Sequence, residues 1–192
     1  MCTSPLARML PLTLAALLLL GAGGLCWGAL DRPPAQKPAN LQVTSPAFRE
    51  GALIPSLYTA DGKDISPPLA WKGVPRGAKS LALVMEDPDA PRGTFVHWLV
   101  WNLPAGQPAL PAAVPRQARL ASGARQGYND FGKVGYWGPA PPRGTHRYFF
   151  RLYALDVTLS LPPQASKAEL LRAMQGHLLA QGSLMGRYRR GD

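Results

Sequence analysis

The chain has 192 residues, 46% of them hydrophobic, which is enough for one domain with a buried core. Its net charge of +10 favours anionic surfaces or phosphate-bearing ligands, although a basic surface that only keeps the protein soluble explains the same charge. Both cysteines, Cys2 and Cys26, lie in an N-terminal leader. A chain cleaved after that leader therefore has no disulfide, thiol nucleophile or thiolate metal site.

Residues 1–28 have the pattern of a secretory signal peptide. A lone Arg8 precedes an apolar run over residues 12–20, and small residues follow. The run is too short to span a bilayer comfortably, so we expect an exported protein, periplasmic or secreted, with cleavage at the end of this stretch. A lipid anchor on Cys26 is the alternative, which Leu25 disfavours because lipoprotein signals have a small residue there.

Residues 29–40 are rich in proline and polar side chains and predict a linker. From residue 41 to residue 190, short apolar segments alternate with Pro, Gly and Asp at intervals of about ten residues, which is typical of a mostly β domain. We expect strands at the apolar segments 41–43, 53–54, 66–71, 80–86, 95–102 and 146–155. The segment 80–86 is almost continuously apolar, so both of its faces should be covered, and its successor 95–102 should follow as a hairpin.

The remaining segments are less regular. Residues 103–125 lack periodicity and are expected to form a long surface excursion. One helix is predicted, with a capping box at Ser166 and Glu169 and an end near Gly182. Its apolar stripe consists of Leu170, Leu171, Met174 and Leu178.

Four polar side chains lie at the ends of predicted strands: Asp87, His97, His146 and Tyr148. Because strand side chains alternate between faces, His146 and Tyr148 share one face and can contact the same ligand. Two imidazoles and a phenol suit a phosphate, and a carboxylate can orient an imidazole. Backbone N–H groups around Gly138 are further candidate donors. The sequence therefore predicts a site for a phosphate or another oxyanion.

Other interpretations of these residues stay open. The same alternation places His97 on one face with Leu99 and Trp101, where it is an ordinary core histidine. Asp87 and Asp89 each adjoin a proline or a turn, and aspartate commonly caps turns. Two histidines and an aspartate are also the ligand set of a non-haem iron site, which would indicate a metal-dependent enzyme. The sequence contains no motif of a serine hydrolase, a P-loop NTPase or a zinc ribbon.

Several separated motifs, in this order, resemble those of the phosphatidylethanolamine-binding protein family, and in particular its bacterial Raf kinase inhibitor-like branch. They are Ser66-Pro67-Pro68-Leu69-Ala70-Trp71, Asp87-Pro88-Asp89-Ala90-Pro91, His97-Trp98-Leu99-Val100-Trp101-Asn102, Gly138-Pro139-Ala140-Pro141-Pro142 and His146-Arg147-Tyr148. The resemblance implies a β-sandwich with a large central antiparallel sheet, a smaller second sheet and a C-terminal helix. It also implies an anion pocket formed by Asp87, His97 and His146 and lined by Tyr148, Asp89, Gly138 and Pro139.

What the resemblance implies about function is binding, without a catalytic reaction, a cofactor or a metal. We expect an exported protein that captures a phosphorylated or oxyanionic small molecule, such as a phospholipid head group, and regulates a partner protease or kinase. The family also suggests a homodimer, and we expect no nucleic-acid partner because the Arg147 and Arg151 face should be solvated. The alternatives are the metal-dependent enzyme and a protease inhibitor that acts through an exposed loop. Ala140 stands where the family commonly has a cysteine, so redox behaviour of the pocket is in doubt.

Overall fold

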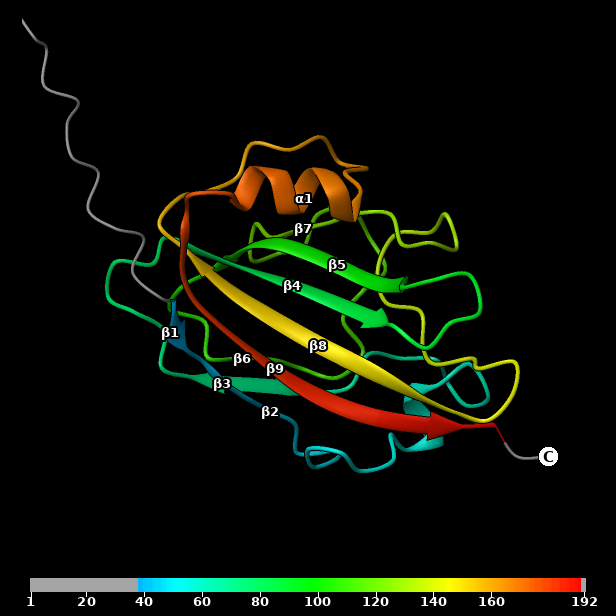
Figure 1. Cartoon of the computed structure of the whole chain (residues 1–192). Coiled ribbons are helices and arrows are strands. Elements are labelled where there is room, and N and C mark those ends of the chain that lie inside the picture. Colours follow the sequence, from blue (N-terminus) through cyan, green and yellow to red (C-terminus); the bar gives the residue numbers. More distant parts are fainter. Residues whose placement is uncertain (1–37, 191–192) are drawn as a thin grey trace, which may run out of the picture. The chain divides into compact units, whose positions relative to one another are not determined.

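The computed structural model describes residues 38–190; the predicted signal peptide, Cys26 and most of the predicted linker lie outside the described residues. Two sheets and one α-helix form layers (Figure 1). The large sheet has the order β1-β9-β8-β4-β5-β7, with the bounds β1 Ala39–Asn40, β9 Leu178–Arg189, β8 Thr145–Leu155, β4 Ser80–Asp87, β5 Phe95–Pro104 and β7 Arg125–Gln126. The small sheet has the order β2-β3-β6, with the bounds β2 Gln42–Thr44, β3 Leu69–Lys72 and β6 Ala109–Leu110.

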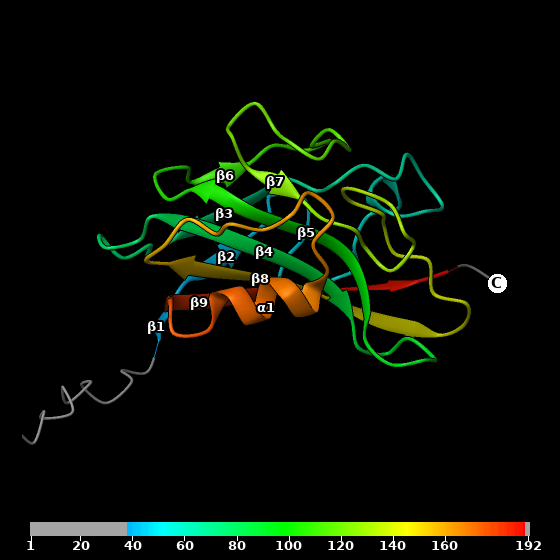
Figure 2. The same ribbon diagram turned by 90° about the horizontal axis from the view of Figure 1, so that it is seen from above.

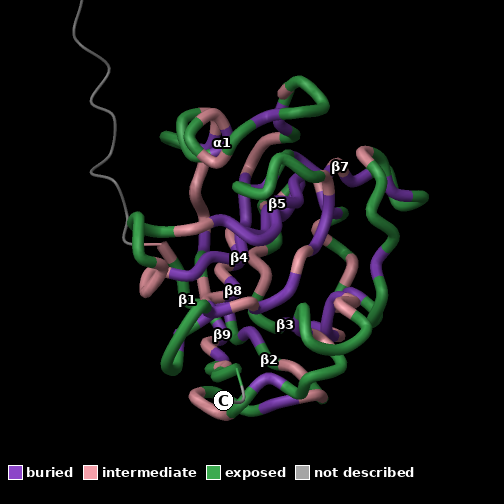
Figure 3. Tube along the Cα trace, turned by 90° about the vertical axis from the view of Figure 1, so that its right-hand side faces the viewer, coloured by how far each residue is buried: buried purple, intermediate pink, exposed green. Residues whose placement is uncertain are grey.

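Two hydrophobic cores hold the layers together. Trp71 and Leu83 belong to the core between the two sheets, whereas Val84 and Leu170 belong to the core between the large sheet and α1, Lys167–Met174. Leu83 and Val84 are neighbours in β4, so this strand is covered on both faces, as predicted, and all eight of its residues are buried. Figure 2 shows α1 lying over the large sheet, and Figure 3 shows β4 and β5 as mostly buried strands in the middle of the domain.

The hairpin of β4 and β5 is antiparallel, as expected, but it contains a β-bulge that changes the face of His97. Met85 is opposite Trp98, whereas the next residue, Glu86, is opposite Val96, so the pairing skips His97. The expectation that His97 shares a face with Leu99 and Trp101 is therefore wrong. Those two residues pack in the core under α1, whereas the ring of His97 packs against Tyr148, which belongs to the core between the sheets.

The predicted helix begins as expected but is shorter. Ser166 and Glu169 form the capping box, and α1 then ends at Met174 rather than near Gly182. Gly176 has a φ of +79°, a conformation that favours glycine, and the chain turns there into β9. The segment from Leu178 pairs with β8 along almost its whole length, so sheet pairing overrides its helical periodicity.

Residues 103–125 are not only a surface excursion. They include β6 and lead into β7, and they bury Val114, Leu120 and Ala124 in the core between the sheets. The predicted edge strand 41–43 corresponds to β2, at the edge of the small sheet, whereas Leu53 makes only an isolated bridge to Arg187. A short 3-10 helix at Ser56–Tyr58 follows.

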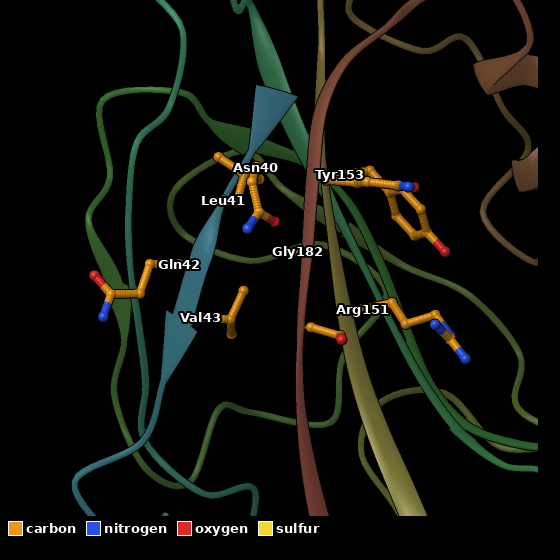
Figure 4. A pocket seen from close by; sticks show the side chains of 9 residues that line it. Asn40, Leu41, Gln42, Val43, Arg151, Tyr153 and Gly182 are labelled. Atoms are coloured by element: carbon orange, nitrogen blue, oxygen red, sulfur yellow. The ribbon is translucent and has the colours of Figure 1, made fainter. Parts of the chain in front are cut away.

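The N-terminal strands pass from one sheet to the other at Leu41. β1 pairs in parallel with β9, which makes the large sheet mixed rather than wholly antiparallel and extends the folded part into the predicted linker. The Leu41 N–H donates to the Gln181 carbonyl at 2.8 Å, and Gly182 lies against the Leu41 backbone (Figure 4). A Cβ atom on Gly182 would lie 2.0 Å from the Leu41 carbonyl oxygen, so only glycine fits this crossing.

Among residues 38–190, no helix has the length and hydrophobicity needed to cross a membrane.

Candidate functional site

Three neighbouring strands bring the predicted site residues together. β8, β4 and β5 are adjacent in the large sheet, and the antiparallel pairing puts the end of β4 beside the starts of β5 and β8 (Figure 1). Asp87 is opposite Phe95, and Glu86 is opposite Phe149. A cavity of about 180 Å³ lies at this end of the sheet, and its lining includes the four predicted side chains Asp87, His97, His146 and Tyr148.

The first pair in the cavity wall is His146 and Asp87. The imidazole Nδ1 lies 2.7 Å from Asp87 Oδ2, and both side chains are buried. Because an ionised carboxylate only accepts hydrogen bonds, Nδ1 carries the proton and donates a hydrogen bond to Asp87. The other carboxylate oxygen of Asp87 accepts the Asp89 N–H at 2.8 Å, so the carboxylate cannot rotate freely. Asp87 therefore fixes the tautomer of His146 and leaves its Nε2 for a ligand.

His97 is fixed in the same way by a backbone carbonyl. Its Nδ1 lies 2.6 Å from the carbonyl oxygen of Trp137, which can only accept, so Nδ1 is the protonated nitrogen of this ring. Burial lowers the pKa of His97 below its ordinary value of 6.5, against the opposing effects of the Trp137 carbonyl and the Asp87 carboxylate. His97 is therefore neutral at pH 7, and its Nε2 carries a lone pair.

Tyr148 supplies a donor without a partner. It is fully buried, and its hydroxyl makes no hydrogen bond to any residue within 38–190. Burial, together with the nearby Asp87 carboxylate, raises the pKa of Tyr148, so the hydroxyl keeps its proton. Asp87 is near enough for this effect but does not meet the geometry of a hydrogen bond with the hydroxyl. A buried polar group without a partner is costly to a fold and commonly marks a place where a ligand or water binds.

The rest of the cavity wall is apolar and was not predicted from the sequence. It consists of Ala90, Pro91, Phe95, Phe131, Ala140 and Pro142. The ring of Phe131 packs edge-on against Phe95 and His97, with centroids 4.7 Å and 5.5 Å away, yet the side chain is 42% exposed. In the sequence, the available signal for Phe131 was a large aromatic residue inside a turn segment bounded by glycines.

Asp89 lies outside this cavity. Its carboxylate accepts hydrogen bonds from Arg147 Nε at 2.9 Å and Arg147 Nη2 at 2.7 Å, as well as from the Arg147 backbone N–H. The Arg147 guanidinium lowers the pKa of Asp89 to about 2, so this carboxylate is ionised throughout the physiological range. Asp89 orders the start of β8 and the turn after β4, and it lines a neighbouring groove.

Gly138 and Pro139 do not line the cavity either. The Gly138 N–H donates to Asp64 Oδ1 at 2.7 Å, and the Trp137 N–H donates to the His97 carbonyl at 3.2 Å. The Pro139 carbonyl accepts the Ala60 N–H at 3.0 Å. These two N–H groups of the loop are therefore used within the protein and are not the free anion donors that the sequence suggested. Gly138 has a spatial role, because a Cβ there would lie 2.5 Å from the Tyr58 carbonyl oxygen.

The site residues are not arranged as a metal site. Both oxygens of Asp87 are used in internal hydrogen bonds, to the Asp89 N–H and to His146 Nδ1, which leaves the two imidazole Nε2 atoms as the free ligand atoms. Within residues 38–190 there is no group of three or more histidine, cysteine, aspartate or glutamate side chains arranged to hold a metal ion. The iron-site alternative therefore has no support in the geometry.

A larger hollow lies elsewhere in the domain, beside the crossing at Leu41. It has a volume of about 440 Å³ and is lined by Asn40, Leu41, Gln42, Val43, Arg151, Tyr153, Gln181, Gly182 and Ser183 (Figure 4). It contains no histidine and no buried unpartnered polar side chain. This hollow is larger than the cavity at the end of β4, but the paired histidines and the unpartnered Tyr148 hydroxyl favour the smaller cavity as the functional site.

This fold and this cavity define a class of β-sandwich protein with a small polar pocket at one end of its central sheet. A family model described as phosphatidylethanolamine-binding protein matches residues 44–189. The chain therefore belongs to the phosphatidylethanolamine-binding protein family, as its motifs indicated.

Relatives in archaea and bacteria share most of the chain. It is 54% identical over 151 residues to a UPF0098 protein of Methanothermobacter thermautotrophicus, covering 79% of this chain and 100% of the relative. It is 50% identical over 155 residues to a UPF0098 protein of Aquifex aeolicus, covering 79% and 90%.

Two solved structures have the same fold. One is a putative phosphatidylethanolamine-binding protein homologue, CT736 of Chlamydia trachomatis, with 44% identity and a TM-score of 0.73, covering 79% of this chain and 99% of that one. The other is YbcL of E. coli, described as a member of the mammalian family, with 34% identity and a TM-score of 0.74, covering 80% and 100%.

Proposed function

We propose that this protein is a binding protein for a phosphorylated or other oxyanionic small molecule, which it holds in the cavity at the end of β4, β5 and β8. The observation that carries the proposal is the Tyr148 hydroxyl, a buried donor without a partner beside two histidines of fixed tautomer. A tetrahedral anion has enough acceptor atoms to satisfy this hydroxyl and to reach both Nε2 atoms. The cavity volume of about 180 Å³ suits one such group rather than a whole lipid.

The tautomers decide which protonation state of the ligand binds. In their neutral forms, His97 and His146 present Nε2 lone pairs to the cavity, and a lone pair repels a fully ionised oxyanion. Binding therefore needs a proton on an imidazole, or a proton on the ligand that a P–OH group can donate to Nε2. A phosphate monoester, with a second pKa near 6, can supply that proton, whereas sulfate cannot.

Calorimetric titration with phosphate, phosphoethanolamine and sulfate between pH 5 and pH 8 tests the proposal. We expect the affinity for all three to rise as pH falls through the region of about 6 to 6.5. Sulfate should bind only at the acidic end, where a histidine is protonated, and phosphate should still bind nearer neutrality. No heat for any of the three ligands across this range would contradict the proposal.

We also propose that ligand binding, rather than catalysis, is the activity of the site and that it serves to regulate a partner enzyme outside the cytoplasm. The support is the family membership for the binding role and the leader-like sequence of residues 1–28 for export. Mass spectrometry of the N-terminus of the native protein tests export. A mature chain that still begins at Met1 would contradict it.

A further inference from the structure

A basic groove adjoins the cavity and shares a wall with it. The groove has a volume of about 690 Å³ and is lined by Asp89, Pro91, Arg143, Gly144, Thr145, His146, Arg147 and Arg187. Pro91 and His146 line both the groove and the cavity. The groove therefore places three arginine residues next to the cavity, on the other side of Pro91 and His146.

The three arginines differ in how their charges are used. Arg147 is paired with the Asp89 carboxylate by two side-chain hydrogen bonds, so the charges of these two residues cancel locally. Arg187 donates its Nε proton to the Gly51 carbonyl at 2.6 Å and has no acidic partner among the described residues. Arg143 is exposed and makes no hydrogen bond or ion pair within residues 38–190. Two guanidinium groups without an acidic partner among the described residues thus line the groove beside the cavity.

We propose that this groove is a second anionic subsite and that the ligand carries two phosphate groups, one in the cavity and one held by Arg143 and Arg187. This inference rests on the proposed function, because the first phosphate occupies the cavity. Guanidinium groups bind phosphate oxygens in pairs, and a cationic wall attracts a second negative charge that the apolar rim of the cavity could not solvate. The class of ligand is therefore a diphosphate or a bis-phosphorylated small molecule.

The test compares inorganic pyrophosphate with orthophosphate in the full chain by calorimetry. We expect pyrophosphate to bind about tenfold more tightly, since two exposed guanidinium contacts each contribute about threefold in affinity. Arg143→Gln should reduce pyrophosphate affinity about threefold and leave orthophosphate affinity unchanged. Arg187→Lys keeps the charge but loses the paired donors and should reduce only pyrophosphate affinity. Arg76→Gln, an exposed arginine before the start of β4, is the matched control and should change neither.

The possible outcomes distinguish a failure of the second subsite from a failure of the proposed anion-binding function. Tight orthophosphate binding with no advantage for pyrophosphate overturns the second subsite and leaves the anion site standing. An equal loss of both ligands in Arg143→Gln also overturns it, because the arginine would then act on the cavity itself. If neither orthophosphate nor pyrophosphate binds, both the proposed function and this inference are wrong. If phosphatidylglycerol vesicles bind the protein through these arginines and pyrophosphate does not bind, the proposed diphosphate ligand is wrong and the groove binds a membrane surface.

Discussion

Asp87 Oδ2 accepts a hydrogen bond from His146 Nδ1 at 2.7 Å, although the two residues are 59 positions apart in the chain. The contact joins the last residue of β4 to the second residue of β8, and the register of these two neighbouring strands creates it. An aspartate in this position orients the imidazole and keeps the proton of its neutral form on Nδ1. The binding chemistry of the cavity therefore depends on a contact that is itself buried and inaccessible to most ligand atoms.

Replacing Asp87 by asparagine should weaken phosphate binding about tenfold, because the amide no longer fixes the orientation and tautomer of the His146 ring. Loss of the Asp87 charge also removes a repulsion of the bound anion, which would strengthen binding. We expect this effect to be the smaller one, because the His146 imidazole lies between the carboxylate and the anion. Calorimetric titration measures the change. Asp156→Asn, which alters an exposed aspartate–histidine pair at the far end of β8, is the control and should bind normally. Tighter binding by Asp87→Asn would show that the carboxylate only repels the ligand.

Tyr148→Phe should weaken phosphate binding without lowering the stability of the domain. The hydroxyl has no partner among the described residues, so removing it should leave the free energy of unfolding unchanged or raise it by up to about 1 kcal/mol. Phosphate affinity should fall about fivefold, because the anion loses one donor. Urea denaturation and calorimetry on the same samples give both quantities. A variant that is much less stable and binds normally would assign the hydroxyl to an internal partner.

Acid should destabilise the domain through His97. Its pKa is lowered in the folded state by burial, so below pH 6.5 the unfolded chain takes up a proton that the folded chain refuses. The contribution of His97 to the free energy of unfolding is fully present above pH 6.5. It is lost as pH falls from there through the lowered pKa, by up to about 1.4 kcal/mol per pH unit. Urea denaturation in phosphate-free buffer between pH 7 and pH 5 measures the slope. His97→Gln should flatten it, whereas His177→Gln, at a half-exposed histidine, should not. An equal slope in the wild type and His97→Gln would contradict the assignment.

Gly182→Ala should destabilise the domain by about 1–3 kcal/mol, because its Cβ meets the Leu41 carbonyl oxygen at the crossing between the sheets. Gly106→Ala is the matched control. Nothing lies within 4 Å of a Cβ at Gly106, and this glycine does not have a positive φ, so its replacement should be neutral or slightly stabilising. Thermal denaturation of both variants tests the difference, and similar melting temperatures would show that the crossing can relax.

The sequence predicted the mostly β fold because strand segments such as 80–86 carry strong local signals of apolar content and bounding turns. The prediction of a helix as far as Gly182 was wrong because Leu178 continues the helical apolar stripe in the sequence. In the structure, the segment from Leu178 is a strand that pairs with β8, which is distant in the chain. Local periodicity cannot reveal a non-local partner. Gly176 was the available signal for the end of the helix.

The candidate site was predicted in composition but not in detail. The alternation of side chains correctly joined His146 to Tyr148, yet it placed His97 on the wrong face, since a single bulged residue in β5 is not visible in the pattern. The positions of Asp89 in the neighbouring groove, of Gly138 away from the cavity and of Phe131 in the cavity wall depend on loops whose course follows from tertiary contacts.

The placement of the cavity on three central strands couples its occupancy to the whole domain. β4, β5 and β8 contribute residues to both hydrophobic cores, so we expect their amide protons to exchange only when the sheet as a whole opens. A bound anion should therefore slow amide exchange throughout these strands, by a factor that grows with ligand concentration over its dissociation constant, rather than only in the surrounding loops. Occupancy of a small site would then raise the free energy of unfolding of the entire domain.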